Sequence, residues 1–115
     1  MPIFRIYTNI LKCEIPDSFL FVATSFIAKL LEKPEPYVQV QVHAEQIMCH
    51  GGSTGPCASV ELLSLGSLGP ANNKEHAKAI SDFIEKQLEI PRKRFFINFV
   101  DLDASNIALG GETFG

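Results

Sequence analysis

The chain has 115 residues, of which 46% are hydrophobic and 20% charged, and its formal net charge is −3 at pH 7. This composition, without a low-complexity segment or a linker, is typical of one compact globular domain over residues 1–115. The acidic balance argues against a nucleic acid or an anionic membrane as the main partner. No apolar run approaches the roughly 18 residues that cross a bilayer, so we expect no membrane insertion.

Signals for classical export and for metal binding are weak. Charged residues interrupt the first twenty positions, which therefore lack the basic segment and the continuous apolar stretch of a secretion signal. Cys13, Cys49 and Cys57 form neither a CxxC pair nor an even disulfide framework, as expected of reduced thiols made in a cytosol. His43 and His50 could complete a zinc site with two of these cysteines, but the spacing matches no standard structural zinc motif. We expect neither a metal nor another cofactor.

The chain opens with an apolar run that predicts a β-strand over Ile3 to Thr8, directly after Pro2. A small second residue generally permits removal of Met1, which leaves the Pro2 nitrogen as a free secondary amine at the terminus. Such an amine is a rigid base with no rotamers to search. The simpler interpretation is that Pro2 only precedes an edge strand, where a missing N–H costs nothing.

Two amphipathic helices are predicted next. Apolar residues spaced by three and four positions form one stripe from Phe19 to Leu31 and another from Ala77 to Leu88. Pro16-Asp17-Ser18 supplies a cap before the first helix. Asn72, with Glu75 three residues later, is typical of a capping box before the second.

An internal repeat joins these helices to strands. The segment Phe26 to Pro34 lines up with Phe83 to Pro91, 57 positions later, and the closing proline of each bounds its helix. A strand is predicted after each proline, over Tyr37 to Val42 and over Phe95 to Val100. The second half also begins with a strand, over Ala58 to Leu65, as the first half does.

The repeat predicts an α/β (α+β) fold made of two βαβ units, residues 2–57 and 58–115. Right-handed crossovers place both helices on one face of a four-stranded mixed sheet, as a ferredoxin-like α/β sandwich. The other face has no helix, yet 95–100 is apolar on both sides, so we expect a partner chain to cover it in a closed symmetric oligomer. Residues 49–55 read as a flexible turn, and 104–115 as edge strands that pair with a neighbouring subunit.

Several short motifs stand out along the whole chain. They are Met1-Pro2, Thr8-Asn9, Lys33-Pro34, Gly51-Gly52-Ser53, Pro56-Cys57-Ala58, Ser64-Leu65-Gly66, Ile97-Asn98 and Thr113-Phe114. Together they closely resemble the macrophage migration inhibitory factor (MIF) family of the tautomerase superfamily. Phe99-Val100-Asp101 and the Thr-Phe ending are more similar to the cytokine branch than to the D-dopachrome tautomerase branch.

The resemblance implies a homotrimer with the tautomerase fold and with pockets between subunits. It implies an isomerase that interconverts keto and enol forms of small aromatic acids such as phenylpyruvate and that tautomerises dopachrome, with Pro2 as the base. It also implies a cytoplasmic protein that is secreted by a leaderless route as a cytokine in immune and inflammatory responses. The class II invariant chain and chemokine receptors are the cell-surface partners that the resemblance suggests.

The candidate site residues fit this chemistry. A base that works near neutral pH must be largely unprotonated, and burial or a nearby cation lowers the pKa of an amine. The family pattern places Lys33 near Pro2, where it would lower the pKa of the amine and bind the substrate carboxylate as a point charge. Asn98 from the adjacent subunit would donate to the substrate. Without the resemblance, Asn98 could equally satisfy backbone groups at a strand edge.

Further residues are expected to line the pocket. Leu65 stands where the family usually has isoleucine, at the carboxylate end, and Tyr37 and Ile107 are the other lining candidates. Phe96 takes the place of a frequent tyrosine and Leu109 that of a frequent tryptophan, so the rim loses a hydroxyl and a large ring. Aromatic substrates should still fit, with altered affinity and preference.

Alternative functions stay open at this point. Val60 removes the family's redox motif at Cys57, so we expect no thiol-disulfide oxidoreductase activity. Lys12 and Glu45 keep the charges of a chemokine-like receptor signature, although each can be a solvated surface charge, and a purely signalling protein with an incidental pocket is the main alternative. Residues 93–100 superficially resemble the basic and aromatic strand of an RNA-recognition module, but that motif's glycine is missing and the chain is acidic.

Overall fold

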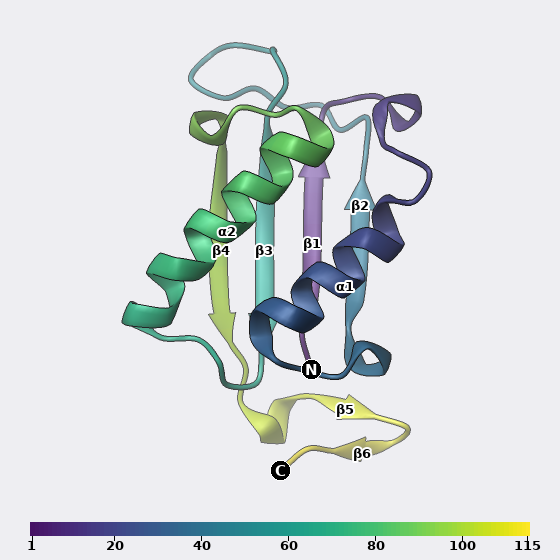
Figure 1. Ribbon diagram of the computed structural model, residues 1–115, viewed down its shortest axis with the longest axis vertical. Helices are drawn as coiled ribbons and strands as arrows, with labels where there is room; N and C mark the ends of the chain where they lie inside the picture. The colour runs from purple at the N-terminus through teal and green to yellow at the C-terminus, as the bar shows by residue number, and fades with distance from the viewer.

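The computed structural model describes residues 1–115 (Figure 1). Short 3-10 turns connect some of the regular elements. In chain order, these elements are β1 (Ile3–Thr8), α1 (Phe19–Leu31), β2 (Gln39–His43), β3 (Ala58–Ser64), α2 (Pro70–Leu88), β4 (Phe95–Asp101), β5 (Ala108–Leu109) and β6 (Glu112–Thr113). Neither helix combines the length and the apolar character that crossing a membrane requires.

The main sheet has the strand order β2-β1-β3-β4. β1 is parallel to β2 and antiparallel to β3, and β3 is parallel to β4. Both helices cover the same face (Figure 1), which confirms the predicted four-stranded mixed sheet of two βαβ units. Each crossover joins two neighbouring strands, whereas a ferredoxin-like sheet places a third strand between them. The ferredoxin-like order that the repeat suggested is therefore wrong, because the two halves meet through β1 and β3 with each βαβ unit intact.

The core lies between the sheet and the helices. Alternate residues of β1, such as Phe4 and Ile6, point into it and are fully buried, as the two-residue period of a strand requires. Phe83 on α2 packs against the helix α1, with ring centroids 5.7 Å from Phe19 and 4.1 Å from Phe26. The predicted stripes of both helices are thus the faces that close the core.

β2 begins later than predicted. Residues Glu35–Tyr37 form a 3-10 turn in which the Tyr37 amide donates to the Pro34 carbonyl at 3.1 Å. The strand starts only at Gln39, whose amide donates to the Pro2 carbonyl at 3.0 Å. The two prolines of this segment favour a turn, because each fixes its own φ and neither can donate to a sheet ladder.

The helix caps also differ from the predictions. Ser18 is the N-cap of α1, but its side chain makes no capping hydrogen bond. The helix α2 begins at Pro70 with Gly69 as N-cap, so the predicted capping box at Asn72 is wrong. Proline suits the first helical position because its φ is already helical and its missing N–H needs no partner there. Asn73 instead closes the cap, since its Oδ1 accepts from the Gly69 amide at 3.2 Å.

The internal repeat extends to the helix ends. Glu32 and Glu89 follow the last residues of α1 and α2, and both are left-handed, with φ of 54° and 55°. This conformation is unfavourable for any residue with a Cβ atom. We expect Glu89→Gly to raise the free energy of unfolding by about 1 kcal/mol in a thermal or urea melt. Glu89→Ala is the matched control and should give no such gain, since alanine keeps the strained φ.

The sheet face opposite the helices is uncovered. It carries polar and apolar side chains together: Arg5 and Glu61 form an ion pair at 3.5 Å, and Phe96 is 75% exposed. On β4, the polar Asn98 lies between Phe96 and Val100 on this face. The prediction that the strand is apolar on both sides therefore holds for Phe96 and Val100 but not for Asn98. The chain by itself therefore exposes large apolar side chains on an open sheet face.

The two segments outside the repeats each make hydrogen bonds within the chain. Residues 49–55 contain a bridge between His50 and Ser53, and Asn9 Nδ2 donates to two carbonyls of this turn at 3.0 Å. Arg94 donates to its carbonyls as well, so the turn is held by side chains from both halves. The strands β5 and β6 pair with each other as a hairpin that projects beyond the end of the main sheet (Figure 1).

Candidate active site

Pro2 is fully buried at the start of a central strand. Its carbonyl accepts from the Gln39 amide at 3.0 Å, which continues the β1–β2 ladder to the very beginning of the chain. The interpretation that Pro2 merely precedes an edge strand is therefore wrong, because β1 lies between β2 and β3. The first residues of the chain are held in the interior by the same pairing that builds the sheet.

Lys33 reaches the same end of the sheet from α1. The helix ends at Leu31, and the Lys33 amide still donates to the Ala28 carbonyl at 2.9 Å. The half-buried Lys33 side chain extends to the loop after β3, where its Nζ donates to the Leu65 carbonyl at 3.1 Å. Two of the predicted site residues, 32 positions apart, are thus in direct contact.

The amine at the start of the chain has a perturbed pKa. In the intact chain this amine belongs to Met1, and its pKa lies below the ordinary value of 8.0. Burial, which penalises the charged form, is the larger cause, and the positive charge of Lys33 is the second. Both causes act in the direction that the proposed base needs, and Pro2, one residue further in, is more buried than Met1.

The other predicted residues are divided between two regions. Ile107 is half-buried directly before β5, a strand that lies beyond the end of the sheet where the chain begins (Figure 1), and Tyr37 is 46% exposed in the turn before β2. Asn98 and Phe96 lie on β4, which β3 separates from β1. Asn98 stands opposite Glu61, and Phe96 lies with its ring 5.3 Å from that of His50. One chain therefore brings Pro2, Lys33 and Leu65 together but leaves Asn98 and Phe96 elsewhere.

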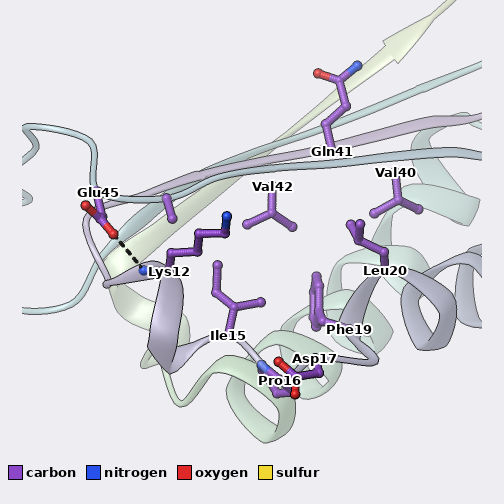
Figure 2. A pocket seen from close by; sticks show the side chains of 11 residues that line it. Lys12, Ile15, Pro16, Asp17, Phe19, Leu20, Val40, Gln41, Val42 and Glu45 are labelled. Atoms are coloured by element: carbon purple, nitrogen blue, oxygen red, sulfur yellow. Dashed lines mark hydrogen bonds between the residues drawn. The ribbon is translucent and has the colours of Figure 1, made fainter.

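A well-formed cavity lies away from the beginning of the chain. It measures about 720 Å³ and lies between the start of α1 and the edge strand β2 (Figure 2). Phe19, Val40 and Val42 contribute to its apolar wall, and Lys12 extends into it. Neither Pro2 nor Lys33 lines it. We call this cavity the edge groove and treat it separately from the candidate active site, because it contains no candidate base.

The sequence reasoning missed the residues that hold the loop after β3. Ser67 in this loop has a φ of 62°, and His76 on α2 is buried with a ring nitrogen on the Ser67 carbonyl. A signal existed for His76, since it lies four residues before Ile80 and thus on the buried stripe of α2. No group of three or more His, Cys, Asp or Glu side chains is arranged to hold a metal ion.

Comparison with known proteins places the chain in a family. The family model described as macrophage migration inhibitory factor (MIF) matches residues 1–115. The chain belongs to the macrophage migration inhibitory factor family. It is 44% identical to the MIF homolog of Brugia malayi over 115 residues, with all of both chains covered. It is 41% identical to the Xenopus laevis MIF over 114 residues, 99% of each chain.

Structural similarity agrees with MIF family membership. The MIF structure from Trichinella spiralis superposes with a TM-score of 0.96 at 35% identity, covering 97% of this chain and 99% of that one. The two βαβ units, with both helices on one face, are therefore the MIF arrangement. Membership supports a MIF-like function in general terms, which includes isomerase activity in the broad sense.

Proposed function

We propose that this protein is a keto–enol tautomerase of phenylpyruvate-like acids and of dopachrome, with the amine of Pro2 as the catalytic base. The observation that carries the proposal is a buried proline at the start of the chain, together with Lys33, whose charge acts on the terminal amine and whose ammonium group donates to the Leu65 carbonyl. The lowered pKa of the Met1 amine, one residue away, supports it, because a base at this place must be unprotonated near neutral pH to accept a proton.

The residues suggest how the reaction proceeds once Met1 has been removed. The Pro2 nitrogen takes a proton from the carbon next to the substrate carbonyl, and the protonated amine then gives it to the carbonyl oxygen. The C–H bond breaks, the O–H bond of the enol forms, and the amine is neutral again. The reverse direction returns one proton to carbon and removes one from oxygen, so no electron leaves the substrate. Lys33 binds the carboxylate as a point charge and keeps the neutral form of the amine populated. Leu65, Tyr37 and Ile107 line the pocket in this proposal.

We further propose that the working unit is a homotrimer in which Asn98 and Phe96 reach the Pro2 of a neighbouring subunit. Within one chain they lie on β4, away from Pro2, so a complete site needs a second copy. Large apolar side chains also remain exposed, among them Ile47 and Phe96 at 106% and 75%. An exposed apolar side chain of one subunit could pack into a hollow such as the edge groove of the next subunit. Such head-to-tail contacts form a closed ring when the rotation between successive subunits closes.

Assay of the purified protein with phenylpyruvate tests the proposal, and a Lys33 variant sharpens it. We expect wild type to interconvert the keto and enol forms and Lys33→Met to raise KM about tenfold, because a charge-assisted contact to the carboxylate is lost. Loss of the nearby positive charge should also raise the pKa of the amine, so the acid limb of the kcat/KM profile moves to higher pH. Lys29→Met, at an exposed position of α1, is the control. A KM and an acid limb that both stay at wild-type values would contradict the role of Lys33.

A cytokine function is the second proposal, and a specific contact favours it. Lys12 and Glu45 are both exposed, and the Lys12 amide donates to Glu45 Oε2 at 3.1 Å (Figure 2). The backbone of Lys12 and the carboxylate of Glu45, the two residues that resemble a chemokine-like signature, therefore lie together at the edge groove, which both residues line. We propose that the protein is cytoplasmic, leaves cells by a leaderless route and binds the class II invariant chain or chemokine receptors.

A further inference from the structure

His76 is an interior polar residue with an incomplete set of partners. It lies in the first half of α2 and is 7% exposed. Its Nε2 lies 2.8 Å from the Ser67 carbonyl oxygen, whereas its Nδ1 is buried without any partner. A carbonyl can only accept, so Nε2 carries the proton and donates. The His76 side chain thus makes one hydrogen bond, from its Nε2–H to the Ser67 carbonyl, and its Nδ1 makes none.

The residue that His76 contacts has a strained backbone. Ser67 has a φ of 62°, in the left-handed region that side chains with a Cβ atom rarely adopt. Such residues persist where the surrounding structure fixes them, and they gather at functional sites. Two helices fix Ser67: His76 on α2 donates to its carbonyl, and its own hydroxyl donates to the Leu31 carbonyl at the end of α1, at 3.3 Å.

The same loop presents the carbonyl that holds Lys33. Leu65 stands two residues before Ser67, and its oxygen accepts from Lys33 Nζ at 3.1 Å. Within the loop, the Ser64 hydroxyl donates to the Gly66 carbonyl at 3.0 Å. Ser67, which both helices hold, and the Leu65 carbonyl, which binds Lys33, thus belong to one short loop with only Gly66 between them.

We propose that His76 is a positioning residue for the candidate active site, acting through Ser67 and the Leu65 carbonyl on Lys33. The inference rests on the proposed function for its catalytic consequence, but its structural part stands separately. If His76 served only to fill space beside Phe99, whose ring centroid is 6.4 Å from its own, any side chain of similar volume would replace it. The proposal instead requires an N–H at the position of Nε2.

Three substitutions of His76 separate these roles. Glutamine carries its amide nitrogen at the ε position and can keep the donor, asparagine carries it one bond too early, and leucine fills space without a donor. We expect His76→Asn and His76→Leu to raise KM for phenylpyruvate by about threefold to tenfold, with a smaller change in kcat, because the carboxylate-binding ammonium group is displaced. His76→Gln should stay within about twofold of wild type. Lys78→Ala, at an exposed position of the same helix, is the matched control.

A second measurement does not depend on catalysis. Amide hydrogen exchange of Gly66, Ser67 and Leu68, followed by NMR on the full-length protein, should be faster in His76→Asn and unchanged in His76→Gln. Should wild type lack tautomerase activity while this exchange pattern appears, the proposed function fails and the positioning of the loop stands. An active wild type with unaltered KM and exchange in His76→Asn would overturn the role of His76 alone.

A substitution outside the core guards against misfolding. Ser67→Ala removes only the hydroxyl that donates to the Leu31 carbonyl. It should raise KM and loop exchange in the same direction as His76→Asn, by a smaller factor. The opposite outcome is that Ser67→Ala keeps the wild-type KM and loop exchange while His76→Gln is as damaging as His76→Leu. That outcome would show that His76 only packs in the core.

Discussion

Pro2→Gly is expected to lower kcat/KM for enol-phenylpyruvate by at least about a hundredfold, the usual contribution of a positioned general base. The variant keeps a terminal amine but loses the ring that fixes φ and makes the amine secondary. An alanine inserted between Met1 and Pro2 should have the same effect, because it moves the free amine by about 3.5 Å along the chain and turns the proline nitrogen into an amide. Spectrophotometric assay of each purified variant measures the loss, and intact mass establishes that Met1 has been removed.

The same variants separate catalysis from signalling. Pro2→Gly should keep its fold and its oligomeric mass, and it should bind the ectodomain of the class II invariant chain like wild type. If binding and activity disappear together in a well-folded variant, the two functions share one surface. Full activity in the insertion variant would exclude the terminal amine as the base.

Ile47→Asp is expected to dissociate the proposed trimer. Ile47 is fully exposed in the single chain, where a polar substitution usually changes stability by less than about 0.5 kcal/mol. At a subunit interface, an unpaired carboxylate would be removed from water at a cost of several kcal/mol. Sedimentation velocity should therefore report three times 12.7 kDa for wild type and 12.7 kDa for the variant.

Activity reports on the same change. Tautomerisation should fall together with the mass, because Asn98 and Pro2 meet only across two copies in the proposed site. Ile47→Val keeps the apolar surface and is the matched control. A trimeric Ile47→Asp, or a wild type that sediments as a monomer, would show that Ile47 does not mediate assembly.

Local patterns predicted the elements well and their connections less well. β1 over Ile3–Thr8 has the predicted bounds, because a strand buries every second side chain and this pattern can be recognised from consecutive residues alone. The order of the strands depends on pairing between β1 and β3, some 55 residues apart, and no local pattern encodes it. The start of α2 was misplaced for a related reason: Gly69 and Pro70 make a cap without the polar residue at the N-cap that the prediction required.

The candidate site was accessible from the sequence only in part. Periodicity explains the burial of Pro2, since it continues the inward-facing positions of β1. It says nothing of Lys33, whose proximity to the start of the chain came from family resemblance alone. The left-handed Ser67 was unpredictable, because a serine gives no sign of a positive φ until His76 and the end of α1 are seen around it. The proposed role of Asn98 depends on how two subunits are placed relative to each other. The residue pattern of one chain does not contain that information.

The burial of Pro2 in a central strand also has an entropic consequence. Chain ends are normally the loosest part of a domain, and ordering one backbone residue costs about 1 to 2 kcal/mol. A base on a fraying end would incur that cost whenever substrate bound. Here the Gln39 amide holds the Pro2 carbonyl and the ring restricts φ, so the ordering is complete when the sheet folds. Substrate would then meet a base that is already immobile, and binding energy remains available for the reacting atoms.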